Sequence, residues 1–235
     1  MTVRAKGKAA VSSTTAIKRM SRAHQRYVGA DGIQYPGVTT VVNLRAKPQL
    51  VKWANKMGLE GVNTENYVSI AGQIGSLTHA MIAHDLGGPE PDTGQFTGSQ
   101  IDMAENAFLS YLNWKKAHTL ETIFVEHQMV SDTMRYGGTC DWYGLYDGQP
   151  WLLDFKTSGG VYDEHKVQTA AYVKLIQEQG YEVVGSRLIQ VGKEANLDYQ
   201  DHPVTEPRLG MYWEIFLRLL DVYWIERALK AQKEG

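Results

Sequence analysis

Two aspartates and a lysine near the middle of the chain have the types and spacing that phosphodiester hydrolysis requires. Asp154 and Lys156 stand in the segment GGTCDWYGLYDGQPWLLDFKTS, residues 137–158, which also contains Asp141. Residues two apart on a strand share one face, so Asp154 and Lys156 are expected to project together. A tight turn at Asp147-Gly148 would fold Asp141 alongside Asp154 in a hairpin, because both lie at nearly equal distances from it.

Neighbouring carboxylates repel each other, and a divalent cation between them removes the conflict. Mg²⁺ binds one or two carboxylates together with water and phosphate oxygens, so we expect Mg²⁺ here, with Mn²⁺ able to replace it. The role expected for Lys156 is to orient the attacking water or to neutralise charge on the phosphate. Taken alone, the three residues also fit a simpler alternative, an exposed ion pair of Asp154 and Lys156 in which Asp141 has no role, because short motifs match by chance.

Composition limits the other kinds of chemistry. The chain has 235 residues and a formal net charge of −2, which disfavours a protein that coats DNA by bulk charge. With Cys140 as its one cysteine it can build no intrachain disulfide, cysteine zinc site or iron–sulfur cluster. There is no apolar run of signal-peptide or membrane-spanning type. We therefore expect a cytoplasmic protein without membrane contacts, in the host cytoplasm if a phage encodes it.

Positive charge is concentrated at the start of the chain. Residues 1–25 are expected to form a basic arm, and residues 26–235 one domain whose motif-bearing core covers about 64–192. Three arginines in or next to the arm are candidates for contacts with DNA phosphates. They are Arg19, Arg22 and Arg26. A solvated terminus without a ligand is the alternative interpretation.

Hydrophobic periodicity divides the chain into helices and strands. Residues 26–42 favour two short strands around a Gly-rich turn. Further strands are expected at 122–130, 136–146, 151–156, 183–191 and 197–201. Helices are expected at about 48–58, 64–86 (with Thr64 as N-cap), from about Ser99, at 163–179 and at about 206–233. This order predicts an α/β fold with a restriction-endonuclease-like core, in which helices flank a central mixed sheet, plus an N-terminal hairpin arm and a long C-terminal helix.

The final helix carries an apolar stripe at helical spacing. Its members are Met211, Ile215, Leu219, Val222 and Ile225. Packing of this stripe against the core is the favoured interpretation, and an oligomer interface is the other. The oligomeric state stays open.

Six motifs in one order resemble the RecB-like branch of the PD-(D/E)xK nucleases. They are PGVTTVV at 36–42, GSLTH at 75–79, VEHQ at 125–128, GTCD at 138–141, DFKTS at 154–158 and QTAAY at 168–172. This branch includes exonucleases of recombination, of mitochondrial genome maintenance and of phages. The resemblance implies a Mg²⁺-dependent DNA exonuclease used in recombination, repair or phage DNA processing.

The resemblance also implies roles for individual residues. His79, Glu126 and the backbone carbonyl of Phe155 would join Asp141 and Asp154 as metal ligands. Gln168 and Tyr172 lie four apart on one helical face and would act with Lys156, and Gln168 would also contact DNA. Thr157 and Ser158, which follow the lysine, are further candidates for DNA contacts. On bare sequence His79 reads instead as an ordinary core histidine, and the nearby His84 points elsewhere on the helix.

Departures from the family pattern leave alternatives. Gly37 stands where the family often has serine, and the cysteines of its iron–sulfur members are absent. The chain has no GxxxxGK[ST] phosphate loop, so a helicase or recombination partner would be a separate chain. A catalytically silent DNA-binding protein and an endonuclease of the same superfamily remain rival interpretations.

Overall fold

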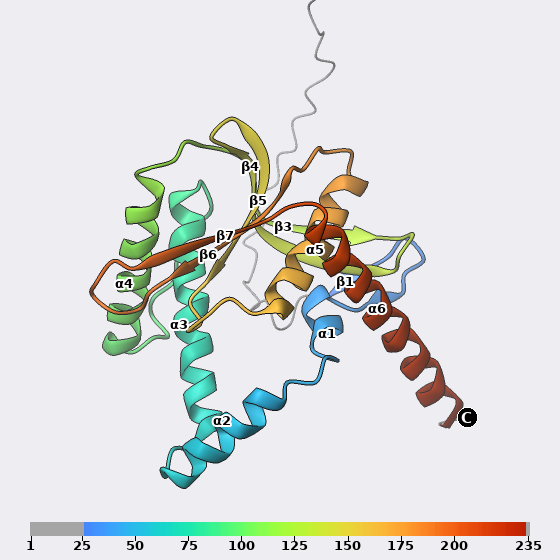
Figure 1. The fold of residues 1–235 in the computed structure, drawn as a ribbon, viewed down its shortest axis with the longest axis horizontal. Coiled ribbons are helices and arrows are strands. Elements are labelled where there is room, and N and C mark those ends of the chain that lie inside the picture. Colours follow the sequence, from blue (N-terminus) through green and yellow to red (C-terminus); the bar gives the residue numbers. More distant parts are fainter. Residues whose placement is uncertain (1–25, 234–235) are drawn as a thin grey trace, which may run out of the picture.

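The computed structural model describes residues 26–233, in which five strands form a mixed sheet between two groups of helices (Figure 1). The strand order is β3-β4-β5-β6-β7, with β5 and β6 parallel and the other neighbours antiparallel. The strands are β3 (Leu120–Ser131), β4 (Tyr136–Tyr146), β5 (Gln149–Lys156), β6 (Gly185–Val191) and β7 (Tyr199–Val204). The parallel pair requires a crossover, which α5 (Asp163–Glu178) provides.

Each face of the sheet is covered by its own helices. One apolar core joins the sheet to α5, to the short α1 (Val38–Val42) and to α6 (Arg208–Lys233). The other face packs against α3 (Thr64–Asp85) and α4 (Gly98–Lys115). A two-stranded hairpin of β1 (Tyr27–Val28) and β2 (Gln34–Tyr35) precedes α1, and α2 (Pro48–Leu59) leads into α3. The predicted mixed sheet, flanking helices, N-terminal hairpin and long C-terminal helix are confirmed.

The predicted hairpin between β4 and β5 is also confirmed. Asp147 and Gly148 have φ values of 48° and 78°, the left-handed conformations that a tight two-residue turn needs. Pairing runs from Tyr146 with Gln149 to Trp142 with Leu153. This register aligns Asp141 with Asp154 immediately beyond the last pair, as the symmetrical spacing predicted.

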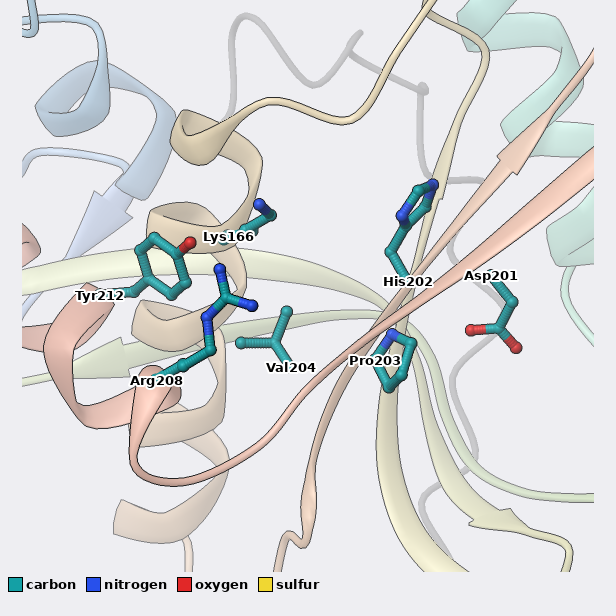
Figure 2. Close-up of a pocket in the computed structure, with 7 residues that line it drawn as sticks. All are labelled: Lys166, Asp201, His202, Pro203, Val204, Arg208 and Tyr212. Atoms are coloured by element: carbon teal, nitrogen blue, oxygen red, sulfur yellow. The ribbon is translucent and has the colours of Figure 1, made fainter.

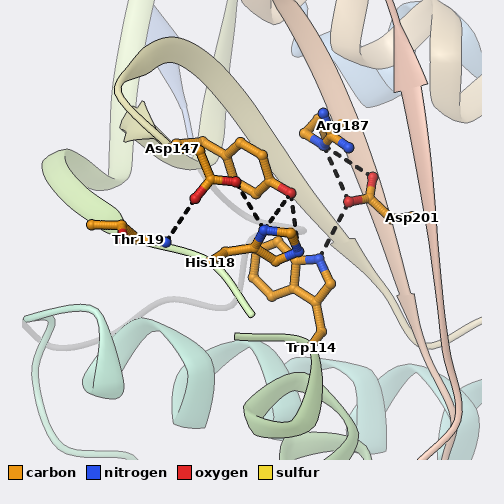
Figure 3. A network of polar contacts seen from close by, with 7 residues as sticks. Trp114, His118, Thr119, Asp147, Arg187 and Asp201 are labelled. Carbon is orange, nitrogen blue, oxygen red and sulfur yellow. Dashed lines mark hydrogen bonds and ion pairs between the residues drawn. The ribbon is translucent and has the colours of Figure 1, made fainter. Parts of the chain in front are cut away.

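A polar network fixes the turn of this hairpin and the edge of the sheet to the end of α4 (Figure 3). The Asp147 carboxylate accepts a 2.8 Å hydrogen bond from the Thr119 backbone N–H and lies 2.9 Å from the His118 ring. On the neighbouring strands Arg187 pairs with Asp201, which also accepts from the Trp114 indole. The network therefore ties the end of α4 and the loop after it to the hairpin turn and to β6 and β7.

Two local expectations are wrong. Residues 38–42 are the helix α1, not the continuation of a strand. The three valines of VTTVV are β-branched and favour strands, but all of them are buried beneath α5 and α6, so tertiary packing outweighs local preference. The N-cap of α3 is Asn63 rather than Thr64, because the Asn63 side chain accepts a hydrogen bond from the Asn66 backbone N–H.

The favoured interpretation of the apolar stripe on α6 is also wrong. Met211 is 66% exposed and Ile225 is 60% exposed. The buried positions lie on a different face of the helix and include two aromatic side chains. They are Leu209, Tyr212, Phe216 and Leu220. The larger aromatic groups bury more area and set the face that packs.

Among residues 26–233, no helix is long and apolar enough to cross a membrane.

Candidate metal and catalytic site

Side chains from three elements converge where β4 and β5 stop pairing. His79 comes from α3, Glu126 from β3 and Asp141 from β4, and one potential ligand atom of each lies within 4.8 Å of the others. The same three residues line a small cavity together with Phe155. The structure thus brings together three predicted metal ligands and places Phe155 beside them.

Asp141 is held in position by two contacts. Its Oδ2 atom accepts a 2.8 Å hydrogen bond from the Phe155 backbone N–H and lies 3.2 Å from Nδ1 of His79. The pairing of β4 with β5 ends at Trp142 and Leu153, and the Asp141 carboxylate satisfies the N–H of Phe155 on β5. A side chain thus takes the place of a backbone acceptor at the site.

Glu126 reaches the cavity through an unusual backbone conformation. Its φ is 48°, in the left-handed region that costs a non-glycine residue roughly 1 kcal/mol or more. It lies between the ladder pairs Val125–Trp142 and His127–Cys140, opposite Asp141. Strain of this kind persists where the surrounding structure holds it, and it is common at functional sites.

Asp154 and Lys156 form a buried ion pair on the α5 side of β5. Their oxygen and nitrogen atoms are 2.7 Å apart, and the Asp154 side chain is 1% exposed. Burial raises the pKa of Asp154; the charge of Lys156 opposes the rise and the nearby Asp141 adds to it. Asp154 does not belong to the trio of His79, Glu126 and Asp141 whose ligand atoms lie within 4.8 Å of one another.

Lys156 connects this pair to α5. Its Nζ atom donates a 3.2 Å hydrogen bond to Oε1 of Gln168, and the amide nitrogen of Gln168 donates a 2.9 Å bond to the Tyr172 hydroxyl. Residues 168 and 172 therefore share one face of α5, as their spacing predicted. Tyr172 fixes which end of the Gln168 amide faces the lysine.

Buried polar atoms test whether a cation fits here. Within the described residues, Oδ1 of Asp154 is buried without a hydrogen-bond partner, whereas its Oδ2 lies beside Lys156. Nδ1 of His79 is also buried, with the Asp141 carboxylate 3.2 Å away. Such atoms are costly unless something else satisfies them. A divalent cation supplies that partner, and carboxylates with one imidazole suit Mn²⁺ as well as Mg²⁺. The residues present fit the predicted metal.

The expected DNA contacts lie at different places. Thr157 and Ser158 begin the loop between β5 and α5; the loop is held by a hydrogen bond from the Gln190 side chain to the Ser158 carbonyl. Arg26 is exposed, and its carbonyl accepts from Gln128 on β3. Arg19 and Arg22, with the rest of the predicted arm, lie outside the described residues.

One residue near the site was given no role from sequence. His165 stands in the first turn of α5, where its Nδ1 accepts from the Tyr162 backbone N–H. Burial and the charge of the nearby Lys156, with those of Lys47 and Lys166, lower its pKa to about 3. His165 is therefore neutral at ordinary pH and adds no positive charge beside Lys156. Only its place three residues before Gln168 hinted at this position.

Comparisons with known proteins are sparse. No family model and no curated protein matches the sequence. Among solved structures, an alkaline exonuclease (LHK-Exo) from Laribacter hongkongensis has a TM-score of 0.35 and 12% identity, over 67% of this chain and 84% of that one. Its complex with dAMP has a TM-score of 0.36 and 13% identity, over 71% and 93%. The structure of SSO0001 has a TM-score of 0.29 and 15% identity, over 63% and 72%. Likenesses at this level leave the activity to be inferred from the site itself.

Proposed function

We propose that this protein is a metal-dependent deoxyribonuclease that hydrolyses phosphodiester bonds from a DNA end. One observation supports this proposal above the others: a trio of potential metal ligands lies near a buried aspartate–lysine pair. Asp141 of the trio and the aspartate–lysine pair belong to one hairpin. An isolated surface ion pair, the bland alternative for Asp154 and Lys156, does not fit an aspartate that is 1% exposed.

The proposed roles follow from the donors and acceptors that each residue has left. His79, Glu126 and Asp141 would hold the cation, and Asp154 and the Phe155 carbonyl are the further ligands proposed. When bound, the cation supplies Lewis acidity toward the phosphate and a water of lowered pKa.

Lys156 has three N–H donors and directs two of them at Asp154 and Gln168. The third is available to a phosphate oxygen, where charge develops as the phosphodiester bond breaks. Gln168 and Tyr172 keep the ammonium group in place. Lys156 and Asp154 are thus the catalytic residues proposed, while Tyr172 is a positioning residue.

Exonuclease rather than endonuclease action rests on the motif resemblance to RecB-like exonucleases. The metal site would be the same for both, since the choice between an end and an internal bond depends on how DNA reaches it. A catalytically silent DNA-binding protein is the remaining rival. It gains nothing from a buried carboxylate, because the desolvation of that charge weakens stability even beside a lysine.

The experiment is a cleavage assay on linear and covalently closed circular DNA, each single- and double-stranded, with Mg²⁺, Mn²⁺ or EDTA. We expect the linear substrates to be degraded with either metal, the circles to survive, and EDTA to stop the reaction. Cleaved circles would indicate an endonuclease. Asp154→Asn and Lys156→Ala should abolish cleavage in protein that still folds.

A matched histidine pair on α3 tests the metal site separately. His79→Ala should lower activity at least tenfold and raise the metal concentration needed for half-maximal rate. His84→Ala should do neither, because His84 is exposed and its ring contacts only the Gly88 carbonyl. Equal behaviour of the two variants would remove His79 from the site.

A further inference from the structure

A polar hollow lies on the side of the sheet that carries the Asp154–Lys156 pair, between β7, α5 and α6 (Figure 2). Its volume is about 190 Å³. It is lined by Lys166 from α5, by Arg208 and Tyr212 from α6, and by four consecutive residues of β7, Asp201, His202, Pro203 and Val204. Figure 2 shows Lys166, Arg208 and Tyr212 extending toward one another from the two helices. None of these residues was singled out by the sequence motifs.

The polar groups around the hollow are mostly hydrogen-bond donors. The Arg208 side chain makes no hydrogen bond or ion pair with the other described residues, so its guanidinium group has its full set of donors available. Lys166 directs one of its three donors to Asp163, at 3.1 Å, and Tyr212 donates its hydroxyl to the same carboxylate. The ring nitrogen Nε2 of His202 is buried without a hydrogen-bond partner among the described residues.

Two aspartates lie near this hollow, and both have partners. The pKa of Asp163 is lowered, chiefly by its hydrogen bond with Lys166, so this carboxylate is ionised and already paired. Asp201 precedes His202 on β7 and therefore points to the opposite face of the sheet. There it pairs with Arg187 and accepts from Trp114. The uncompensated charge that faces the hollow is that of Arg208.

The hollow is in register with the catalytic hairpin. Asp154 pairs with Leu188 on β6, and Leu188 pairs with His202 on β7. Paired residues on neighbouring strands point to one face, so Asp154 and His202 share the α5 side of the sheet. Two strand spacings separate them, which is roughly 10 Å. A nucleic acid strand whose scissile phosphate lies at Lys156 would thus have another phosphate within reach of the hollow.

We propose that the hollow formed by Lys166, His202, Arg208 and Tyr212 binds a phosphate group. A planar guanidinium with an ammonium beside it supplies several N–H donors to the acceptor oxygens of a phosphate. That the phosphate belongs to the DNA strand being cleaved rests on the proposed nuclease function. Binding of phosphate itself does not.

The first experiment tests the site without DNA. Inorganic phosphate is titrated into the full chain by calorimetry, in EDTA and at constant ionic strength. Arg208→Gln should weaken binding about tenfold or more, because it removes a charge-assisted contact. Arg218→Gln is the control: Arg218 lies on the same helix, 75% exposed, and pairs with Glu214 and Asp221. It should bind phosphate like the wild type.

The second experiment identifies the source of the phosphate. Labelled single-stranded oligonucleotides with a 5′-phosphate, a 3′-phosphate or no terminal phosphate are bound in EDTA. If the hollow takes a terminal phosphate, Arg208→Gln weakens only the matching oligonucleotide. If it takes a backbone phosphate, all three weaken, and the slope of log affinity against log salt falls by about 0.7.

The outcomes separate the two proposals. Unchanged affinity of Arg208→Gln for inorganic phosphate and for all three oligonucleotides overturns the hollow, whatever the cleavage assay shows. If phosphate binding depends on Arg208 but the protein cleaves no DNA with Mg²⁺ or Mn²⁺, the proposed phosphate site is supported and the proposed nuclease function is wrong.

Discussion

The backbone N–H of Phe155 donates a 2.8 Å hydrogen bond to the Asp141 carboxylate just beyond the last residue pair of β4 and β5. Asp141 thus has two functions: it replaces a backbone acceptor and contributes an oxygen to the cluster with His79 and Glu126. A change at Asp141 can therefore separate folding from metal binding.

Asp141→Asn keeps an acceptor oxygen for Phe155 and removes the charge. We expect its free energy of unfolding to stay close to that of the wild type while metal binding and cleavage are lost. Asp141→Ala also leaves the Phe155 N–H without its acceptor, which costs about 1–3 kcal/mol. Urea unfolding and a Mn²⁺ titration of both variants check this. Equal stability of the two would show that the hydrogen bond contributes little.

Tyr172 is expected to act through Gln168 rather than on the substrate. Tyr172→Phe removes the acceptor that orients the Gln168 amide, so kcat should fall several-fold while KM and metal affinity stay unchanged. Tyr143→Phe is the matched control, since its hydroxyl donates to the Glu182 carbonyl away from the site. That variant should lose only stability. A change in KM in Tyr172→Phe would point to substrate contact instead.

Two glycines on α3 offer a sharper test of how the helix approaches the loop after Lys156. An added Cβ at Gly75 would lie 3.1 Å from the Thr157 hydroxyl oxygen, whereas one at Gly72 would meet nothing within 4 Å. Gly72→Ala should raise the free energy of unfolding by up to about 1 kcal/mol and leave cleavage unchanged. Gly75→Ala must displace Thr157, so we expect cleavage to fall with little gain in stability. Parallel urea unfolding and cleavage assays decide between them.

The sequence predicted the parts of the site that depend on local geometry. The Asp147-Gly148 turn and the period of two were enough to align Asp141 with Asp154 and to put Lys156 on the face of Asp154. The helical spacing of Gln168 and Tyr172 was equally local. His79 and Glu126 come from elements far from the hairpin in the chain, so their convergence depends on tertiary packing, and only the ordered motifs indicated it.

Other features had no local signal. The left-handed conformation of Glu126 lies within the β3–β4 ladder, and the pairing of β4 with β5 ends next to Asp141; nothing in VEHQ or GTCD distinguishes these positions from a regular ladder. The hollow at Arg208 joins residues from β7, α5 and α6 whose spacing matches no motif. On α6 the predicted stripe lost the competition for the core to a face that carries larger aromatic side chains.

That competition on α6 gives a prediction about stability. Phe216 is fully buried against Tyr136, so Phe216→Ala should cost about 3–5 kcal/mol. Ile225 is 60% exposed, and Ile225→Ala should change the free energy of unfolding by no more than about 0.5 kcal/mol in a monomer. Unfolding measured at several protein concentrations checks both values. A large, concentration-dependent effect at Ile225 would mean that a second copy covers the exposed stripe.

The contact between Asp147 and Thr119 predicts how stability depends on pH. The hydrogen bond from the Thr119 backbone N–H lowers the pKa of Asp147, and the bond with His118 lowers it further. A carboxyl group whose pKa is lower in the folded state stabilises the fold at pH values above its unfolded pKa, about 4. This contribution is lost as pH falls through the lower folded pKa.

Asp147→Asn is the comparison, because asparagine also tolerates the φ of 48° and can still accept a hydrogen bond from Thr119. The wild type should be the more stable protein at pH 6, and the difference should shrink steadily below pH 4. A difference that stayed constant between pH 6 and pH 2 would show that the charge of Asp147 does not contribute.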